Sequence, residues 1–142
     1  TILLDAAHNP HGARALAAAL GDSFDFGHLV AVVGVLGDKD VAGIVEALAA
    51  AVDQVVVTAP RSSRAMAAED LAMLVGAVFD EDRVFVEPDL LDALDRAVAL
   101  AEEAGELGGS GVVVTGSVAL VGQARSLLVG AGGADLGPQA DR

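Results

Sequence analysis

The sequence predicts an α/β fold with a doubly wound, mainly parallel sheet. Five short apolar runs are each followed by a segment of helical length, so strands and helices alternate along the chain. The runs are rich in Val and lack polar alternation, which is typical of strands covered by helices on both faces. A length of 142 residues fits one domain with a sizeable core.

The first two strand–helix units are expected within residues 2–51. Residues 2–4 form a short apolar strand, and a helix follows over 10–20, because Pro suits the first helical turn, where its missing N–H would have had no partner. Residues 29–33 are rich in β-branched side chains and predict the second strand. The second helix is expected over about 41–51.

The last three units follow the same pattern of a Val-rich run and then a longer segment rich in Ala and Leu. The predicted strands are residues 54–58, 83–87 and 111–115. The predicted helices are residues 67–78, 88–104 and 118–129. Residues 1–130 therefore form one domain, with a flexible acidic surface connection over 102–111. Residues 131–142 have too few apolar side chains to offset the entropy of ordering, which predicts a disordered tail.

The composition excludes several classes of function. The net charge is −13 with only eight Lys and Arg residues, so the surface repels phosphate backbones and nucleic-acid binding is not expected. No apolar run approaches the ~20 residues that span a bilayer, and no signal peptide is visible. The absence of cysteine excludes disulfides and thiolate metal sites, and is compatible with a cytoplasmic protein.

The chain begins with Thr1 and enters its first strand at once, while both methionines, Met66 and Met73, are internal. We therefore expect a domain taken from a longer protein whose missing part lies N-terminal. Processing of a short leader is the alternative.

Polar residues follow the predicted strands, at the edge where open α/β sheets bind ligands. Asp5 ends the first strand, and it is either a cap or surface carboxylate or a ligand for two hydroxyls of a ribose. His8 and Asn9 follow it. His8 is either an ordinary loop residue or a group that holds a carboxylate or phosphate by charge-assisted hydrogen bonds.

Cations are few, and three of them lie in loops at this edge. Lys39, the chain's only lysine, is a candidate for binding a phosphate or a carboxylate, whereas the neighbouring Asp40 is expected to cap the next helix. Arg61 and Arg64 share one loop. They either contact the neighbouring domain or a substrate carboxylate, which matches the planar guanidinium, or they form ion pairs with the acidic surface.

Two glycine-containing motifs are absent, and the turn at Ser117 has two interpretations. Gly34 and Gly37 do not have the spacing of the G-x-G-x-x-G dinucleotide fingerprint. G-x-S-x-G is absent, so a hydrolase nucleophile is not supported. Ser117 is expected to be the N-cap of the last helix, whose first N–H groups also attract anions.

The segment Asp5-Ala6-Ala7-His8-Asn9-Pro10 resembles the D-G-A-H-N-P motif that opens the C-terminal domain of folylpolyglutamate and dihydrofolate synthases, members of the Mur-type ATP-dependent amide ligases. Residues 34–40 (G-V-L-G-D-K-D), residues 60–65 (P-R-S-S-R-A) and the stretch T-G-S…V-G over 115–122 are similar to later motifs of that family, in family order. Ala6 departs from the family's Gly, and an L-residue would be strained there if the backbone needed φ > 0.

The resemblance implies a Rossmann-like C-terminal domain and gives roles to individual residues. Asp5 would contact the ribose of ATP, with Asn9 beside it. His8 would lie near both the nucleotide and the incoming glutamate, as the catalytic residue. Ser117 would lie beside the glutamate. The substrate contacts proposed for Lys39, Arg61 and Arg64 follow instead from their charge and their position in these loops. No metal ligand is implied in this chain.

The implied reaction is ATP-dependent addition of L-glutamate to dihydropteroate or a folate through an acyl phosphate. ATP and Mg²⁺ would be held mainly by an N-terminal ATP-binding domain, the partner of this one. The isolated domain is expected to be inactive, because it lacks G-x-x-x-x-G-K-[ST]. We expect a cytoplasmic monomer.

Two alternatives remain open. A peptidoglycan-type Mur ligase domain would have the same fold, although the G-D-K-D and T-G-S…V-G segments look more like the folate enzymes. A standalone flavodoxin-like or receiver-like module is the other. Receivers need an acidic cluster at the first strand and an Asp after the third, whereas here the first offers only Asp5 and the third ends Val57-Thr58-Ala59-Pro60.

Overall fold

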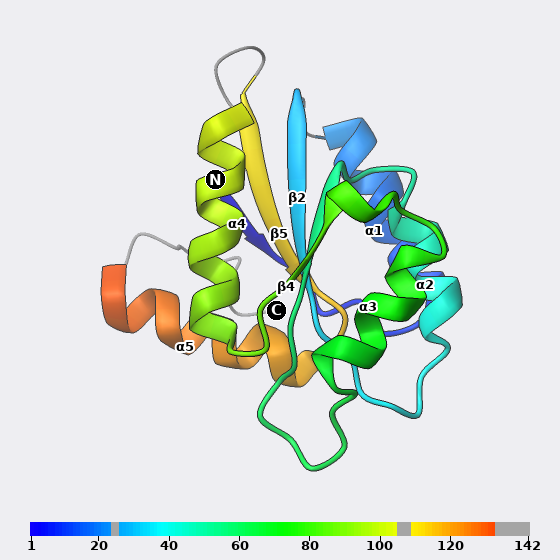
Figure 1. Ribbon diagram of the computed structural model, residues 1–142. Coiled ribbons are helices and arrows are strands. Elements are labelled where there is room, and N and C mark those ends of the chain that lie inside the picture. The colour runs from blue at the N-terminus through cyan, green and yellow to red at the C-terminus, as the bar shows by residue number, and fades with distance from the viewer. Residues whose placement is uncertain (24–25, 105–108, 133–142) are drawn as a thin grey trace.

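The computed structural model describes residues 1–23, 26–104 and 109–132, and within them five strands form one sheet flanked by helices (Figure 1). The strands are β1 (Ile2–Leu4), β2 (His28–Val33), β3 (Gln54–Val57), β4 (Val84–Val86) and β5 (Ser110–Thr115). The helices are α1 (Pro10–Ser23), α2 (Val41–Leu48), α3 (Ala68–Gly76), α4 (Leu90–Ala104) and α5 (Val118–Gly132), with a 3₁₀ turn η1 (Glu81–Arg83) before β4.

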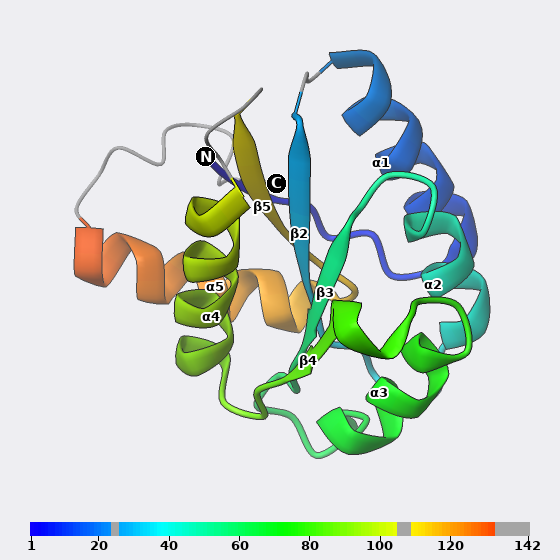
Figure 2. The same ribbon diagram turned by 45° about the horizontal axis from the view of Figure 1, so that its top comes forward.

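The sheet order is β1-β5-β2-β3-β4, and every pairing is parallel. Helices α1, α2 and α3 cover one face, and α4 and α5 cover the other (Figures 1 and 2). The predicted doubly wound parallel fold is therefore confirmed. Among the described residues, none of the helices combines the length and apolarity needed to cross a bilayer.

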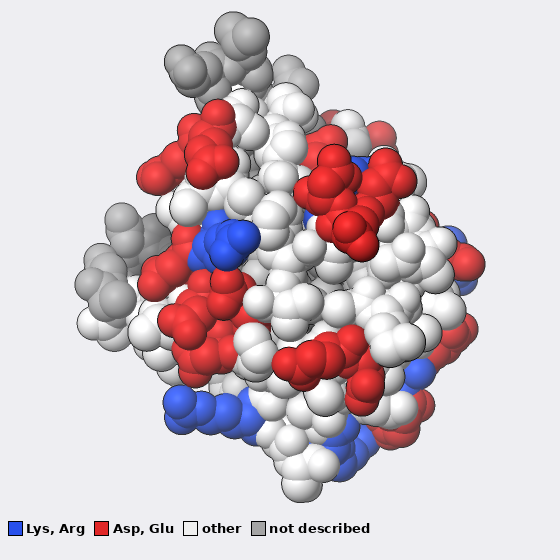
Figure 3. Space-filling model, in the orientation of Figure 1, with Lys and Arg blue, Asp and Glu red and all other residues white. Residues whose placement is uncertain are grey.

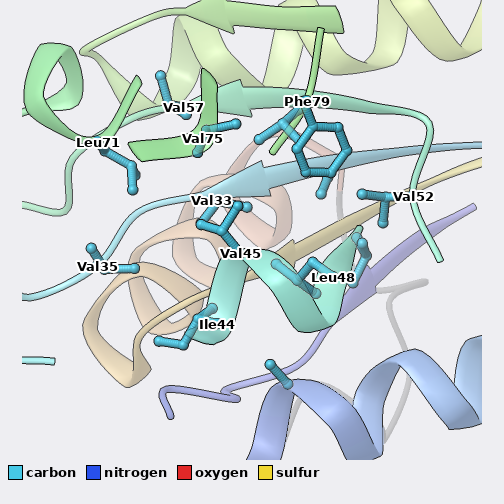
Figure 4. Close-up of a cluster of buried hydrophobic side chains, with 14 of the residues drawn as sticks. Val33, Val35, Ile44, Val45, Leu48, Val52, Val57, Leu71, Val75 and Phe79 are labelled. Atoms are coloured by element: carbon cyan, nitrogen blue, oxygen red, sulfur yellow. The ribbon is translucent and has the colours of Figure 1, made fainter. Parts of the chain in front are cut away.

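Each central strand contributes side chains to two separate cores, because successive residues of a strand point to opposite faces. Val33 and Val57 pack with Ile44, Leu48 and other residues under α1, α2 and α3, as Figure 4 shows for this face. Val32, Val56 and Val114 belong to the core under α4 and α5. Burial on both faces explains why these strands are continuous runs of Val.

Element boundaries differ from the predicted ones at several ends. β4 is shorter than predicted because residues 81–83 form η1. α2 ends at Leu48, since Ala49 already caps it, and α5 continues to Gly132. Of the predicted connection over 102–111, residues 102–104 belong to α4 and residues 110 and 111 to β5, while residues 105–108 lie outside the described part of the chain. Of the predicted tail, residues 131 and 132 are helical and 133–142 lie outside the described residues.

Candidate functional site

The carboxyl ends of β1 and β5 are neighbours in the sheet, but the helices that follow them leave to opposite faces. The chain passes from β1 to α1 on one side and from β5 to α5 on the other. Such a divergence is the topological switch point at which open α/β sheets bind ligands. It lies between the loop of residues 5–9 and the turn of residues 116–117.

Hydrogen bonds between backbone groups hold these two segments together. Gly116 N–H donates to the carbonyl of Ala7 at 3.0 Å, and Asp5 N–H donates to that of Val114 at 3.0 Å. Gly116 has φ of +116°, and a Cβ built there would lie 2.6 Å from the carbonyl oxygen of Gly34. Glycine is therefore required here, both for its backbone conformation and for the close approach of the β2 loop.

Asp5 is half-buried and uses one carboxylate oxygen to shape its own loop. Oδ1 accepts a hydrogen bond from Ala7 N–H at 2.9 Å, the pattern of an Asx turn. The other oxygen, Oδ2, has no protein partner in the described part of the chain. Ala6 is unstrained, because no non-glycine residue of that part has positive φ. Alanine thus satisfies this backbone as well as glycine would.

His8 is exposed, and its ring has a defined tautomer. Nδ1 lies 3.0 Å from the carbonyl oxygen of Ala6. Because a carbonyl only accepts, Nδ1 must carry the proton, which leaves Nε2 as the basic nitrogen of the neutral ring. Asn9, in contrast, caps α1: its Oδ1 accepts from Gly12 N–H at 2.7 Å.

Ser117 is the N-cap of α5, as predicted. Its Oγ accepts a hydrogen bond from Leu120 N–H at 3.0 Å. Only 2% of the residue is exposed. Its hydroxyl is therefore turned into the fold, and its contact with a substrate stays a prediction.

The loops after β2 and β3 are joined to each other along their length. Gly37 N–H donates to the carbonyl of Arg64 at 2.9 Å, and Met66 N–H donates to that of Val35 at 3.0 Å. Lys39 is half-buried in the first loop. Asp40 caps α2 as predicted, accepting from Gly43 N–H at 3.1 Å.

Arg64 is engaged by an exposed carboxylate. Its guanidinium donates to Asp38 at 2.9 Å, and that hydrogen bond lowers the pKa of Asp38 below its usual value. Both side chains are mostly exposed, so the pair contributes little to stability. Of the two predicted roles for Arg64, the structure shows the ion pair.

Arg61 lies on an open groove of about 620 Å³, between the β3 loop and the start of α4 and α5. Its backbone is held by Gln123 of α5, a residue that sequence reasoning missed because a lone Gln on a helix carries no motif. Pro88, Leu91, Val118 and Leu127 provide apolar lining. In the view of Figure 3, basic side chains lie at the lower end of the molecule, and another lies near the centre among acidic ones.

The structure thus brings Asp5, His8, Asn9 and Ser117 together at the β1–β5 junction. It places Lys39, Arg61 and Arg64 in the loops of β2 and β3, further along the same edge. No group of three or more His, Cys, Asp or Glu side chains that could hold a metal ion occurs within the described residues.

Comparison with known proteins gives consistent matches. The family model described as "Mur ligase, glutamate ligase domain" matches residues 1–118. The chain is 47% identical over 135 residues to the dihydrofolate synthase/folylpolyglutamate synthase of Mycobacterium tuberculosis, covering 89% of this chain and 28% of that protein. The chain therefore spans less than a third of the length of this relative.

Solved structures agree. A folylpolyglutamate synthase of Mycobacterium tuberculosis complexed with ADP superposes with a TM-score of 0.87 at 49% identity, over 89% of this chain and 29% of that one. E. coli FolC in complex with DHPP and ADP gives a TM-score of 0.78 at 28% identity, over 92% of this chain and 29% of that one.

Proposed function

We propose that this chain, which belongs to the Mur ligase glutamate ligase domain family, is the C-terminal domain of a folylpolyglutamate/dihydrofolate synthase. In the whole enzyme, ATP phosphorylates a carboxylate of dihydropteroate or of a folate glutamyl tail. The amino group of L-glutamate then attacks the acyl phosphate, forming an amide and releasing phosphate.

The observation that carries the proposal is the hydrogen bond of 3.0 Å between Gly116 N–H and the Ala7 carbonyl. This bond brings together two motifs that lie far apart in the sequence. The loop with Asp5 and His8 meets the turn that opens α5, at the switch point of the sheet. The domain acts there by orienting the reactants and excluding water.

Asp5 fits the ribose of ATP. Its Oδ1 is occupied by Ala7 N–H, while the carboxylate has further lone pairs to accept hydrogen bonds from a hydroxyl pair. Asn9 supports this contact by fixing the start of α1. The loop is therefore ordered before the nucleotide arrives.

His8 is suited to contact the amino group of glutamate and the phosphate that is released. With Nδ1–H held by the Ala6 carbonyl, Nε2 of the neutral ring can accept a proton from the glutamate ammonium group. A protonated ring can instead donate Nε2–H to an anionic oxygen. Ser117 lies at the adjoining turn.

Lys39 and Arg61 bind the carboxylates of glutamate. Arg64 could bind one only after its ion pair with Asp38 breaks. The described residues contain no group of three or more His, Cys, Asp or Glu side chains that could by itself hold Mg²⁺. We assign the metal and the phosphate-binding loop to an N-terminal ATP-binding domain, consistent with the short share of the relative that this chain spans. We further propose a cytoplasmic monomer, and no ATP turnover by this chain alone.

Asp5→Asn in the full-length enzyme tests the nucleotide contact. Asparagine keeps an oxygen for the Ala7 N–H but removes the charge and one acceptor. We expect the KM for ATP to rise about tenfold, since a charged hydrogen bond is lost, while the KM for glutamate changes little. Steady-state kinetics with each substrate varied in turn measure both.

Asp95→Asn is the matched control, because Asp95 is exposed on α4, the helix that follows β4 at the opposite side of the sheet from β1. It should leave both constants unchanged. An Asp5→Asn enzyme with the wild-type KM for ATP would remove Asp5 from the nucleotide site. Glutamate transfer to a peptidoglycan precursor in place of a folate would support the other Mur ligase class.

A further inference from the structure

Gln123 holds the backbone of Arg61 on both sides. Its Oε1 accepts a hydrogen bond from Arg61 N–H at 2.8 Å, and its Nε2 donates to the Arg61 carbonyl at 3.0 Å. Only one orientation of the amide satisfies both contacts, because the N–H can only donate and the carbonyl can only accept. The two bonds therefore fix the plane of the Gln123 amide and the backbone of Arg61 together.

The contact joins two elements that lie 62 residues apart in the sequence. The later part of the same loop is bonded to the β2 loop instead, through Arg64 and Met66. Before Arg61, Pro60 is buried and has a fixed φ. Gln123 thus ties the start of the loop to α5, and the backbone that carries the Arg61 side chain is ordered in advance.

Both residues line the groove at the start of α5. Its apolar wall includes Leu91 and Val118, which are 48% and 63% exposed. A guanidinium beside an apolar surface suits a ligand with a carboxylate on a short hydrocarbon chain, because the methylenes can lie on the wall while the carboxylate is bound. L-glutamate has that chemistry.

We propose that Gln123 is a positioning residue for Arg61, and that its two hydrogen bonds set the affinity of the enzyme for the carboxylate of L-glutamate. This rests on the proposed function, in which Arg61 binds that carboxylate. Gln123 itself touches no reactant. Its effect passes through the direction in which the Arg61 side chain leaves the loop, and misplacement by about 1 Å is costly at a binding group.

The test uses the full-length enzyme with Gln123→Met, Arg61→Met and the double variant. Methionine keeps the length of the side chain and removes both amide contacts. We expect Gln123→Met to raise the KM for glutamate about tenfold, with the KM for ATP unchanged. In the Arg61→Met background the same change should have no further effect on the glutamate KM, because the group it positions is gone.

Two measurements separate positioning from general structure. Hydrogen exchange of the peptide that contains Arg61 should be faster in Gln123→Met, while thermal unfolding stays close to wild type. Gln54→Met, at the opposite end of the sheet where Gln54 contacts His28, is the matched Gln-to-Met control and should not change the glutamate KM.

The outcomes distinguish the two proposals. If Arg61→Met raises the glutamate KM and Gln123→Met does not, the positioning role is wrong and the binding role of Arg61 stands. If neither variant changes it, both are wrong, whereas the Asp5 contact with ATP is unaffected. Additive effects in the double variant would also overturn positioning.

Discussion

The amino ends of the parallel strands form one edge of the sheet and the carboxyl ends form the other, and the polar side chains at these two edges differ in use. At the amino edge they hold the structure together. Arg83 donates from Nε to the Asp53 carbonyl at 2.5 Å and from a terminal nitrogen to that of Val52 at 3.2 Å, and its guanidinium lies 4.8 Å from the centre of the Phe79 ring. Asp53 accepts from Leu29 N–H at 2.7 Å, and His28 contacts Gln54 at 2.6 Å.

At the carboxyl edge the loops are joined mainly by backbone groups. Bonds between main-chain groups join the β1 loop to the β5 turn and the β2 loop to the β3 loop, while the side chain of Gln123 joins the β3 loop to α5. Side chains that follow the strands are left with capacity for other partners, as at Nε2 of His8. An edge held by its backbone can offer side chains to a ligand without losing stability when they are engaged, and we propose that structure and function separate between the two edges in this way.

The largest expected effect is at Gly116, where the carboxyl edge depends on the backbone. Gly116→Ala places a Cβ at positive φ and 2.6 Å from the Gly34 oxygen. Strain and overlap together should reduce the free energy of unfolding by about 2–5 kcal/mol. Urea denaturation of this chain measures the loss.

Gly122→Ala is the control for that change. Gly122 lies in α5, and no atom lies within 4 Å of the position that its Cβ would take, so alanine should keep or raise stability, by up to ~1 kcal/mol. Equal effects of the two variants would show that the approach of the three loops at Gly116 is not tight.

Arg83→Met probes the amino edge, where a side chain carries the structure. Losing its bonds to two carbonyls should lower the free energy of unfolding by about 2 kcal/mol, because hydrogen bonds from charged groups are stronger than neutral ones. In the full-length enzyme the KM values for ATP and glutamate should stay unchanged. Arg14→Met, on the exposed side of α1, is the control and should change neither quantity. A raised KM for either substrate would contradict a purely structural role of the amino edge.

The smallest effect is expected at the exposed pair of Arg64 and Asp38. Because the folded state lowers the pKa of Asp38, the pair stabilises the protein above the usual pKa of an aspartate, and this is lost as pH falls through the lowered value. Arg64→Gln should raise the Asp38 pKa toward normal, with little change in stability at neutral pH. An NMR titration of the carboxyl carbon checks this, and an unchanged titration would mean that the ion pair does not persist in solution.

The sequence predicted the fold well because its strongest signals are local. Runs of Val bounded by turn residues specify buried parallel strands, and the caps at Asp40 and Ser117 follow from residue type alone. The boundary of β4 was missed because residues 81–83 take a 3₁₀ turn, for which charged residues give no periodic signal.

The site was predictable only in part. Asp5 and His8 could be placed at the carboxyl edge because each follows a strand. Ser117 could not be recognised as 2% exposed, since burial depends on how α5 packs. Gln123 and Arg83 act through contacts with distant backbone groups, which depend on tertiary structure and leave no pattern in sequence.

The position of β5 has a consequence for synthesis. β5 is the last of the five strands to leave the ribosome, yet it lies between β1 and β2 and pairs with both. Until residues 110–115 emerge, β1 has no neighbour in this sheet and the β1 loop is not joined to the β5 turn. Strands β2, β3 and β4 can assemble earlier, because they are consecutive in both sequence and space. In the growing chain the side of β2 that will pair with β5 therefore stays unpaired. Exposed strand edges of that kind are sites where nascent chains associate wrongly.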